Sequence, residues 1–275
     1  MNHATSSILS GHHFSVHMTN ALRQIGVSPE TLSDAQRLQL DDQGFLLLPG
    51  MMPPALLAEF RHVHERLMSL KYPDPSLPTP PLVDDRWNHE PGTRRIADLV
   101  SQDPLYDCTY TNPSVLAAVS HILGRDFKLH SLNARDALPG SGIQDFHRDG
   151  YHPPGSCNLV NSAWLLDGFT LDNGSTRVIP GSHSHREQPT CGLDAHPDQV
   201  VVTAEAGSVL VFRGDLLHSG TTNLSGQIRR VFHVAFCLRK EDIGVHDQNR
   251  LIRKSTWERI SPEARWILNV AAQGP

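Results

Sequence analysis

Four residues in the second half of the chain have the types and spacing of a metal-centred reaction site. His147 and Asp149 lie two residues apart in FHRDGYH, and His218 follows 71 residues after His147 in GDLLHSGTTN. Two histidines and one carboxylate form the facial triad of non-haem Fe(II) oxygenases, which leaves coordination positions for a cosubstrate and O2. Arg229, eleven residues after His218, could pair with a dicarboxylate cosubstrate such as 2-oxoglutarate.

The spacing predicts that strands carry these residues. Alternate side chains of a strand share a face, so His147 and Asp149 would point inward and Arg148 outward. The third ligand must come from a distant strand that folds back. The segment LLHSG places His218 at a strand end, and Arg229 opens the next strand, RRVFHVAFCL. Two imidazoles and a carboxylate are a ligand set typical of iron, whereas structural zinc sites are rich in thiolates.

Longer segments resemble the phytanoyl-CoA dioxygenase-like branch of the Fe(II)/2-oxoglutarate dioxygenases. The resemblance implies that His147, Asp149 and His218 bind iron. It also implies that Arg229 binds the distal carboxylate of 2-oxoglutarate, and that Asn133, on the preceding strand, helps to hold this cosubstrate. The matching segments, between about Ser33 and Leu238, are HRD (147–149), LDNGSTRVIPGSH (171–183), AGSVLVFRGDLLHSG (206–220), TNLSGQIRR (222–230) and DDQGFLLLPGMM (41–52).

The resemblance further implies oxidation of an unactivated C–H bond, with release of succinate and CO2. In related halogenases a small residue stands at the position of Asp149, so the carboxylate argues for hydroxylation, desaturation or ring formation. Substrates in this branch include acyl-CoA thioesters, amino acids, osmolytes and secondary metabolites. The acidic net charge and the lack of a clear basic cluster favour a small metabolite over a CoA thioester.

Two other functions stay open. Arg229 argues against a cupin-like metal enzyme that does not use 2-oxoglutarate, and succinate release would separate the two. The complete triad argues against a catalytically degenerate jelly-roll binding protein, and Fe(II) binding would decide that case. Two further histidine pairs, His12–His13 and His183–His185, have no carboxylate or third ligand nearby in sequence and are weak metal candidates.

Several nearby residues are expected to be structural. Arg230 would point to the opposite face of its strand from the inward residues. The suspected lid carries Arg86, Trp87, Arg94 and Arg95, for which solvated surface is expected rather than substrate contact. Trp164 and Phe146 could line the pocket, but core packing explains them equally well or better.

Composition limits the partners. The net charge of −5 and the pI near 6.4 argue against nucleic acid or an anionic membrane surface. The chain has no apolar run long enough for a transmembrane helix, and its first residues do not resemble a signal peptide. Four cysteines without a CxxC motif indicate reduced thiols. We therefore expect a cytoplasmic protein with a small-molecule substrate.

The whole chain is expected to form a single, mainly β oxygenase domain. Residues 128–239 contain seven strand-like segments separated by glycine, proline and asparagine. Strands that follow helices without β–α–β alternation favour a double-stranded β-helix, the cupin-like jelly roll, with flanking helices. Residues 240–275 are expected to form a helical tail.

The residues before this core are expected to support it. Residues 1–32 are predicted to be a loosely packed arm, and residues 33–127 to form helical support. A capping box of Ser33 and Gln36 opens a short helix there. A longer helix should run from Pro53 to Leu70, with an apolar stripe that ends at Leu70. The proline-rich segment 72–92 is expected to be a lid over the barrel mouth.

Overall fold

The computed structural model describes five stretches of the chain. These are residues 13–73, 92–149, 156–185, 192–241 and 247–271. Nearly all of the predicted lid, residues 72–92, lies outside them, so the lid stays a prediction. Residues 1–12 of the predicted arm also lie outside the described residues.

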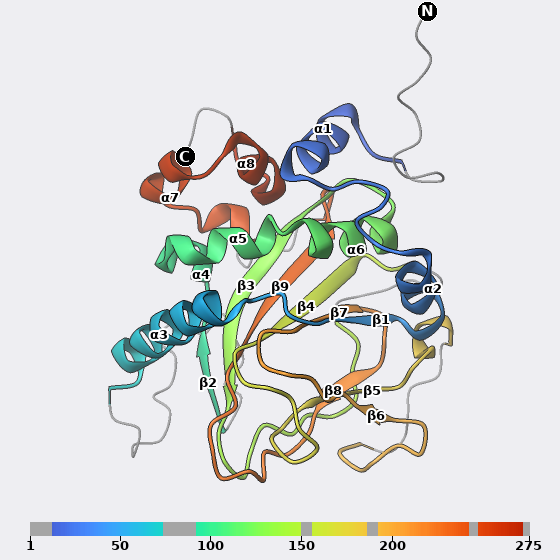
Figure 1. Cartoon of the computed structure of the whole chain (residues 1–275), viewed down its shortest axis with the longest axis vertical. Helices are drawn as coiled ribbons and strands as arrows, with labels where there is room; N and C mark the ends of the chain where they lie inside the picture. Colours follow the sequence, from blue (N-terminus) through green and yellow to red (C-terminus); the bar gives the residue numbers. More distant parts are fainter. Residues whose placement is uncertain (1–12, 74–91, 150–155, 186–191, 242–246, 272–275) are drawn as a thin grey trace, which may run out of the picture.

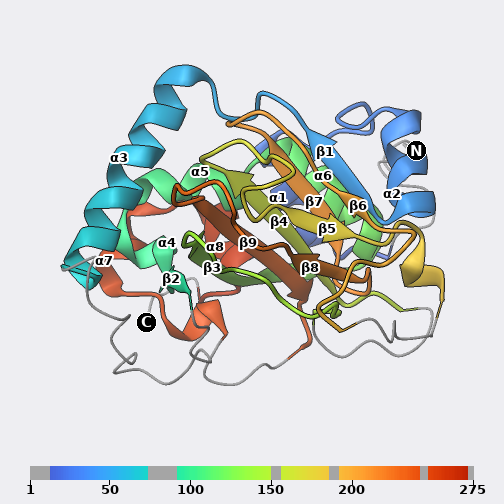
Figure 2. The same cartoon turned by 90° about the horizontal axis from the view of Figure 1, so that it is seen from below.

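A six-stranded antiparallel sheet forms the centre of the molecule (Figure 1). A three-stranded sheet lies against one of its faces (Figure 2). These two sheets, with helices outside them, confirm the predicted jelly-roll class. The large sheet runs in the order β1 (Phe45–Leu48), β7 (Val209–Arg213), β4 (Leu159–Leu165), β9 (Val231–Leu238), β3 (Phe127–Ala137) and β2 (Thr93–Ile96). The small sheet runs in the order β6 (Val200–Val201), β5 (Thr176–Val178) and β8 (His218–Gly220).

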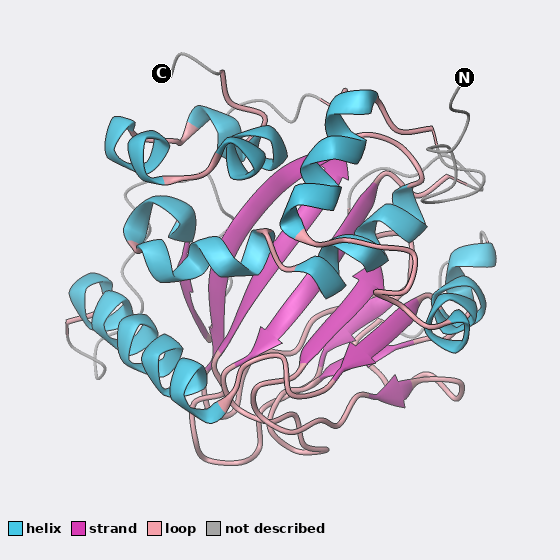
Figure 3. Cartoon of the chain, turned by 45° about the horizontal axis from the view of Figure 1, so that its top comes forward, coloured by secondary structure: helices cyan, strands magenta, loops and turns pink. Residues whose placement is uncertain are grey.

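Helices gather along the other face of the large sheet and at its edge (Figure 3). None of the described helices has the length and apolar character that a membrane crossing requires. The helices are α1 (Val16–Ile25), α2 (Asp34–Gln43), α3 (Pro54–Lys71), α4 (Leu99–Gln102), α5 (Asp107–Tyr110), α6 (Pro113–Leu123), α7 (Lys254–Arg259) and α8 (Pro262–Leu268).

Alternate side chains of the central strands belong to two different cores. On β9, Phe232 and Val234 pack outward against the helices, whereas Val231 packs inward with Leu210 and Val178 between the two sheets. This two-residue period follows from the geometry of a strand. A polar residue at an inward position of β9 or β3 therefore faces the space between the sheets.

Local signals located the helix starts. Ser33 and Gln36 form the predicted capping box at the start of α2. In α3, however, Leu70 is 73% exposed, so the predicted apolar stripe is wrong at its end. Leu57, Phe60 and Leu67 of the predicted stripe are buried, and His64 and Met68 are buried beside them, so the covered face ends at Met68. At about 100° per residue, Leu70 lies roughly 200° away from Met68 on the helix.

The N-terminal segment is better packed than its composition suggested. Residues 16–25 form α1, in which Met18 and Leu22 are buried, so the expectation of a loosely packed arm is corrected here. The Ser15 side chain accepts a hydrogen bond from the Met18 amide and caps this helix. The few apolar residues of α1 occupy a single stripe, which its polar overall composition concealed.

Candidate metal centre

His147 and His218 are paired directly through their backbones. The His147 amide donates to the His218 carbonyl, and the His218 amide donates to the His147 carbonyl, both at 3.0 Å. His218 is the first residue of β8, but His147 forms only an isolated bridge, so the predicted strand is wrong over the described part of FHRDGY, residues 146–149. The pairing still sets both imidazoles on one side, with ring centroids 4.4 Å apart.

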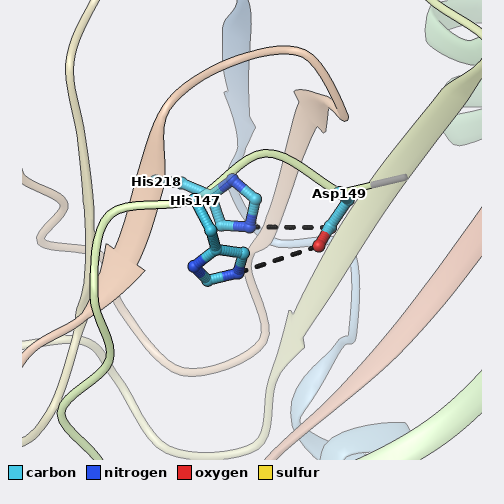
Figure 4. A group of neighbouring side chains, drawn as sticks. All are labelled: His147, Asp149 and His218. Carbon is cyan, nitrogen blue, oxygen red and sulfur yellow. Dashed lines mark ion pairs between the residues drawn. The ribbon is translucent and has the colours of Figure 1, made fainter. Parts of the chain in front are cut away.

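Asp149 completes the group, as Figure 4 shows. Its Oδ1 lies 3.8 Å from Nε2 of His147, and its Oδ2 lies 3.5 Å from Nε2 of His218. A metal ion with bonds of 2.0–2.2 Å needs ligand atoms within roughly 4.4 Å of one another. Both separations meet that limit. Arg148 points away, as predicted, and donates to the carbonyls of Asp215 and Ser182.

Backbone carbonyls determine the tautomers of both histidines. His147 Nδ1 lies 2.8 Å from the Asp145 carbonyl, and His218 Nδ1 lies 3.0 Å from the Leu216 carbonyl. A carbonyl only accepts, so each Nδ1 carries the proton and each Nε2 presents a lone pair. Both lone pairs face the Asp149 carboxylate. Three acceptors that converge in this way fit a cation between them.

The protonation states also suit a metal. Burial raises the pKa of Asp149, but the nearby His218 and His147 and a hydrogen bond from Asn161 outweigh it, so this pKa lies below its usual value. Burial lowers the pKa of His218. The carboxylate is therefore ionised and the imidazole neutral near pH 7, which are the forms that bind metal ions.

The triad opens onto a cavity of about 340 Å³ between the sheets. Four polar side chains in its wall make no hydrogen bond to any described residue: Asn133, Gln144, Thr176 and His233. Asn133 was anticipated from the sequence, and the other three were missed. His233 had a readable signal, because it lies four residues after Arg229 and shares its face of the strand.

Arg229 lies deep in the same cavity. It is only 3% exposed, and its guanidinium donates to the Gly174 carbonyl at 2.7 Å. The guanidinium also lies over the Phe169 ring, 5.2 Å from the ring centroid. Thr176, two residues after Gly174, lines the cavity as well. These contacts hold the cation in place, so little side-chain entropy is lost when an anion binds there.

The fold assembles a basic cluster that is not visible in the sequence. Lys71 of α3, Arg95 of β2, Arg135 of β3 and Arg229 all line the cavity. Arg95 and Arg135 are directly opposite residues on neighbouring strands, so their side chains share a face. The expectation that Arg95 is solvated surface is therefore wrong, as is the view that the chain lacks a basic cluster.

Other sequence candidates have structural roles. Arg94 is buried and donates to Asp136 at 2.7 Å, so it is not a solvated surface residue. Arg230 pairs with Asp167 outside the cavity, as expected from its strand face. Trp164 is a core residue stacked on Phe232.

The chain matches known proteins along most of its length. The model of the phytanoyl-CoA dioxygenase (PhyH) family matches residues 40–231. Dioxygenase trt7 of Aspergillus terreus is 28% identical over 226 residues, which cover 76% of this chain and 74% of the relative. The iron/alpha-ketoglutarate-dependent dioxygenase ausO of Aspergillus calidoustus is 30% identical over 146 residues, or 48% of each chain. The chain spans about half the length of several other curated relatives, such as dioxygenase aneA of Aspergillus aculeatus, at 49%.

Solved structures share the fold. HygX of Streptomyces hygroscopicus, with nickel and 2-oxoglutarate bound, superposes with a TM-score of 0.63 at 20% identity and covers 76% of this chain and 88% of its own. The carbocyclase SnoK from nogalamycin biosynthesis reaches a TM-score of 0.59 at 17% identity over 76% of this chain and 85% of its own. These superpositions show that the fold is shared. The match to the family model shows the family: this chain belongs to the phytanoyl-CoA dioxygenase (PhyH) family.

Proposed function

We propose that the protein is an Fe(II)- and 2-oxoglutarate-dependent dioxygenase that hydroxylates an unactivated C–H bond of a small-molecule metabolite and releases succinate and CO2. One observation carries this proposal. The Nε2 atoms of His147 and His218 and the carboxylate of Asp149 converge in the cavity that also contains the buried Arg229. Membership of a dioxygenase family supports it.

The triad residues would hold the iron. Bound Fe(II) supplies the activation of O2 that couples decarboxylation of 2-oxoglutarate to oxidation of the substrate. The chain contributes geometry. The carbonyls of Asp145 and Leu216 keep the protons on Nδ1 of His147 and His218, and Asn161 orients the carboxylate of Asp149.

Arg229 would bind the distal carboxylate of 2-oxoglutarate. Its planar guanidinium can hold a carboxylate through two parallel hydrogen bonds and stays charged when buried. Thr176, near the carbonyl that fixes this guanidinium, can add a hydroxyl hydrogen bond. Asn133, on β3 beside the strand that follows Arg229, would contact the cosubstrate nearer to the metal.

The substrate would be a small molecule whose reacting end enters this cavity. A cavity of about 340 Å³ lies at the lower end of the range for ligand sites and must hold the cosubstrate too. Among the structures with this fold, HygX has been solved with hygromycin B bound, and SnoN with nogalamycin RO bound. These names support a role in secondary-metabolite biosynthesis. The basic cluster in the cavity removes the charge argument against a CoA thioester.

The test is reconstitution with Fe(II), 2-oxoglutarate and O2, with succinate as the readout. The controls are the same reaction without 2-oxoglutarate and the complete reaction with the Asp149→Ala variant. We expect succinate only from the complete mixture and not from either control. The rate should rise when a substrate is supplied from a metabolite library. Substrate oxidation without 2-oxoglutarate would favour the cupin-like alternative. A protein that fails to bind Fe(II) would favour the degenerate binding module.

A further inference from the structure

Asn133 and His233 form a polar pair on the inner face of the large sheet. They are opposite residues in the β3–β9 ladder, so their side chains lie side by side, and both line the cavity. Ala137 and Arg229 are paired in the same register. Arg229 and His233 therefore lie on one face, four residues apart along one chain segment, with apolar Val231 between them.

The next inward position places the pair relative to the metal centre. Ala235, two residues beyond His233, is opposite Asn161 of β4. Asn161 donates a hydrogen bond from Nδ2 to Oδ2 of Asp149 at 3.1 Å. His233 thus lies between the position of Arg229 and the position that supports the triad. A ligand that extends from Arg229 to a metal ion at the triad must pass His233.

The pair has unused hydrogen-bonding capacity. The side chains of Asn133 and His233 make no hydrogen bond to any described residue, although both residues are only partly exposed. Other partly or fully buried histidines do have protein partners: His64 binds Asp136, and His183 binds the Asp41 carbonyl. Buried polar groups without protein partners are uncommon, so these two are suited to bind what enters the cavity.

His233 remains neutral in this position. Burial, together with Arg135, Arg229 and Arg95, lowers the pKa of His233 to about 3. Its strand neighbours leave room for a ligand, because Ala163 is opposite it on β4 and Ala235 follows on its own strand. A neutral imidazole and a neutral amide can each donate one hydrogen bond to a carboxylate without bringing a further charge next to the metal.

We infer that His233 and Asn133 bind the metal-chelating end of the cosubstrate by donating hydrogen bonds to the C1 carboxylate of 2-oxoglutarate. The inference rests on the proposed function and adds His233 as a positioning residue. Arg229 and the pair then hold opposite ends of one molecule. Loss of either contact weakens binding of 2-oxoglutarate, but only loss of the pair weakens binding of a ligand that has the chelating end alone.

The experiment titrates the Mn(II)-loaded protein calorimetrically, since Mn(II) binds such ligands and the measurement requires no turnover. The probes are 2-oxoglutarate and oxalate, which resembles the chelating end and has no distal carboxylate. The variants are His233→Ala, His233→Gln, Asn133→Ala and Arg229→Ala. The matched control is His62→Ala, which removes an exposed imidazole from α3. Mn(II) titration of each variant shows that its triad is intact.

We expect His233→Ala to weaken binding of both probes by roughly 10- to 150-fold, as for loss of a hydrogen bond to a charged group. Asn133→Ala should act in the same direction, and His233→Gln should recover part of the loss. Arg229→Ala should weaken the binding of 2-oxoglutarate and leave the binding of oxalate unchanged.

The outcomes separate this inference from the proposed function. If 2-oxoglutarate does not bind the Mn(II)-loaded wild type, the proposed function fails. If the wild type and Arg229→Ala behave as expected but His233→Ala and Asn133→Ala bind both probes like the wild type, the inference is overturned and the proposed function stands. Should His233→Ala not fold, Asn133→Ala and His233→Gln decide the question.

Discussion

Asn161 donates a hydrogen bond from its Nδ2 to Oδ2 of Asp149 over 3.1 Å. The carboxylate of the metal centre is thus oriented by a side chain from β4, a central strand of the large sheet. Oδ1 of Asn161 is buried and has no hydrogen-bond partner among the described residues. The amide therefore supports Asp149 from one side and leaves an acceptor at the cavity wall.

Replacement of Asn161 by alanine should weaken metal binding by about 10- to 100-fold, the usual effect of losing a partner that orients a metal ligand. Titration with Mn(II) or Fe(II) under anaerobic conditions measures this. Asn161→Asp should be worse than Asn161→Ala, because a second carboxylate would repel Asp149. Wild-type metal affinity in Asn161→Ala would show that the hydrogen bond has no functional role.

Replacement of Asp149 by glycine should abolish hydroxylation. The change removes the only anionic ligand of the triad and leaves two neutral imidazoles, so Fe(II) affinity should fall sharply. The readouts are metal content after gel filtration and succinate formation with 2-oxoglutarate. Unchanged turnover would rule out the assigned role of this carboxylate.

Replacement of Arg229 by alanine should raise the half-saturating concentration of 2-oxoglutarate about 30-fold to several thousand-fold. The distal carboxylate would be left without its cation in a buried site, at a cost of roughly 2–5 kcal/mol. Lysine should rescue only partly, because it supplies a point charge without the planar fork. Metal affinity should stay the same, since the triad is untouched.

Titration of succinate formation with 2-oxoglutarate compares the wild type with Arg229→Ala and Arg229→Lys. Equal half-saturation in all three proteins would remove the arginine assignment and most of the case for this cosubstrate.

His233 should make the metal-free protein less stable in acid. Its pKa of about 3 in the folded state lies below the usual value of 6.5, so the unfolded chain binds more protons between these two pH values. Stability should therefore decline as the pH falls from about 6.5 towards 3, by up to several kcal/mol at ~1.4 kcal/mol per pKa unit. Urea unfolding of the wild type and His233→Gln over this range tests it. The decline should be shallower in the variant, and parallel curves would contradict the assignment.

Short-range features of this protein were readable in the sequence. The capping box of Ser33 and Gln36 depends on contacts within three residues. The triad residues and Arg229 stood out because few residue types perform this chemistry and their spacing suited strands. These signals sufficed for the fold class and for the family, which the match over residues 40–231 confirms.

The tertiary structure decided which distant residues meet. His147 reaches His218 through one isolated bridge rather than the expected strand, and Arg95 and Arg135 become cavity neighbours through the β2–β3 register. His233 reaches Asn133 through the β3–β9 register. A register between strands is set by the burial of entire strand faces, and a shift of one residue would turn every side chain to the opposite face. That choice depends on packing summed over the whole core, so it cannot be read from any single segment.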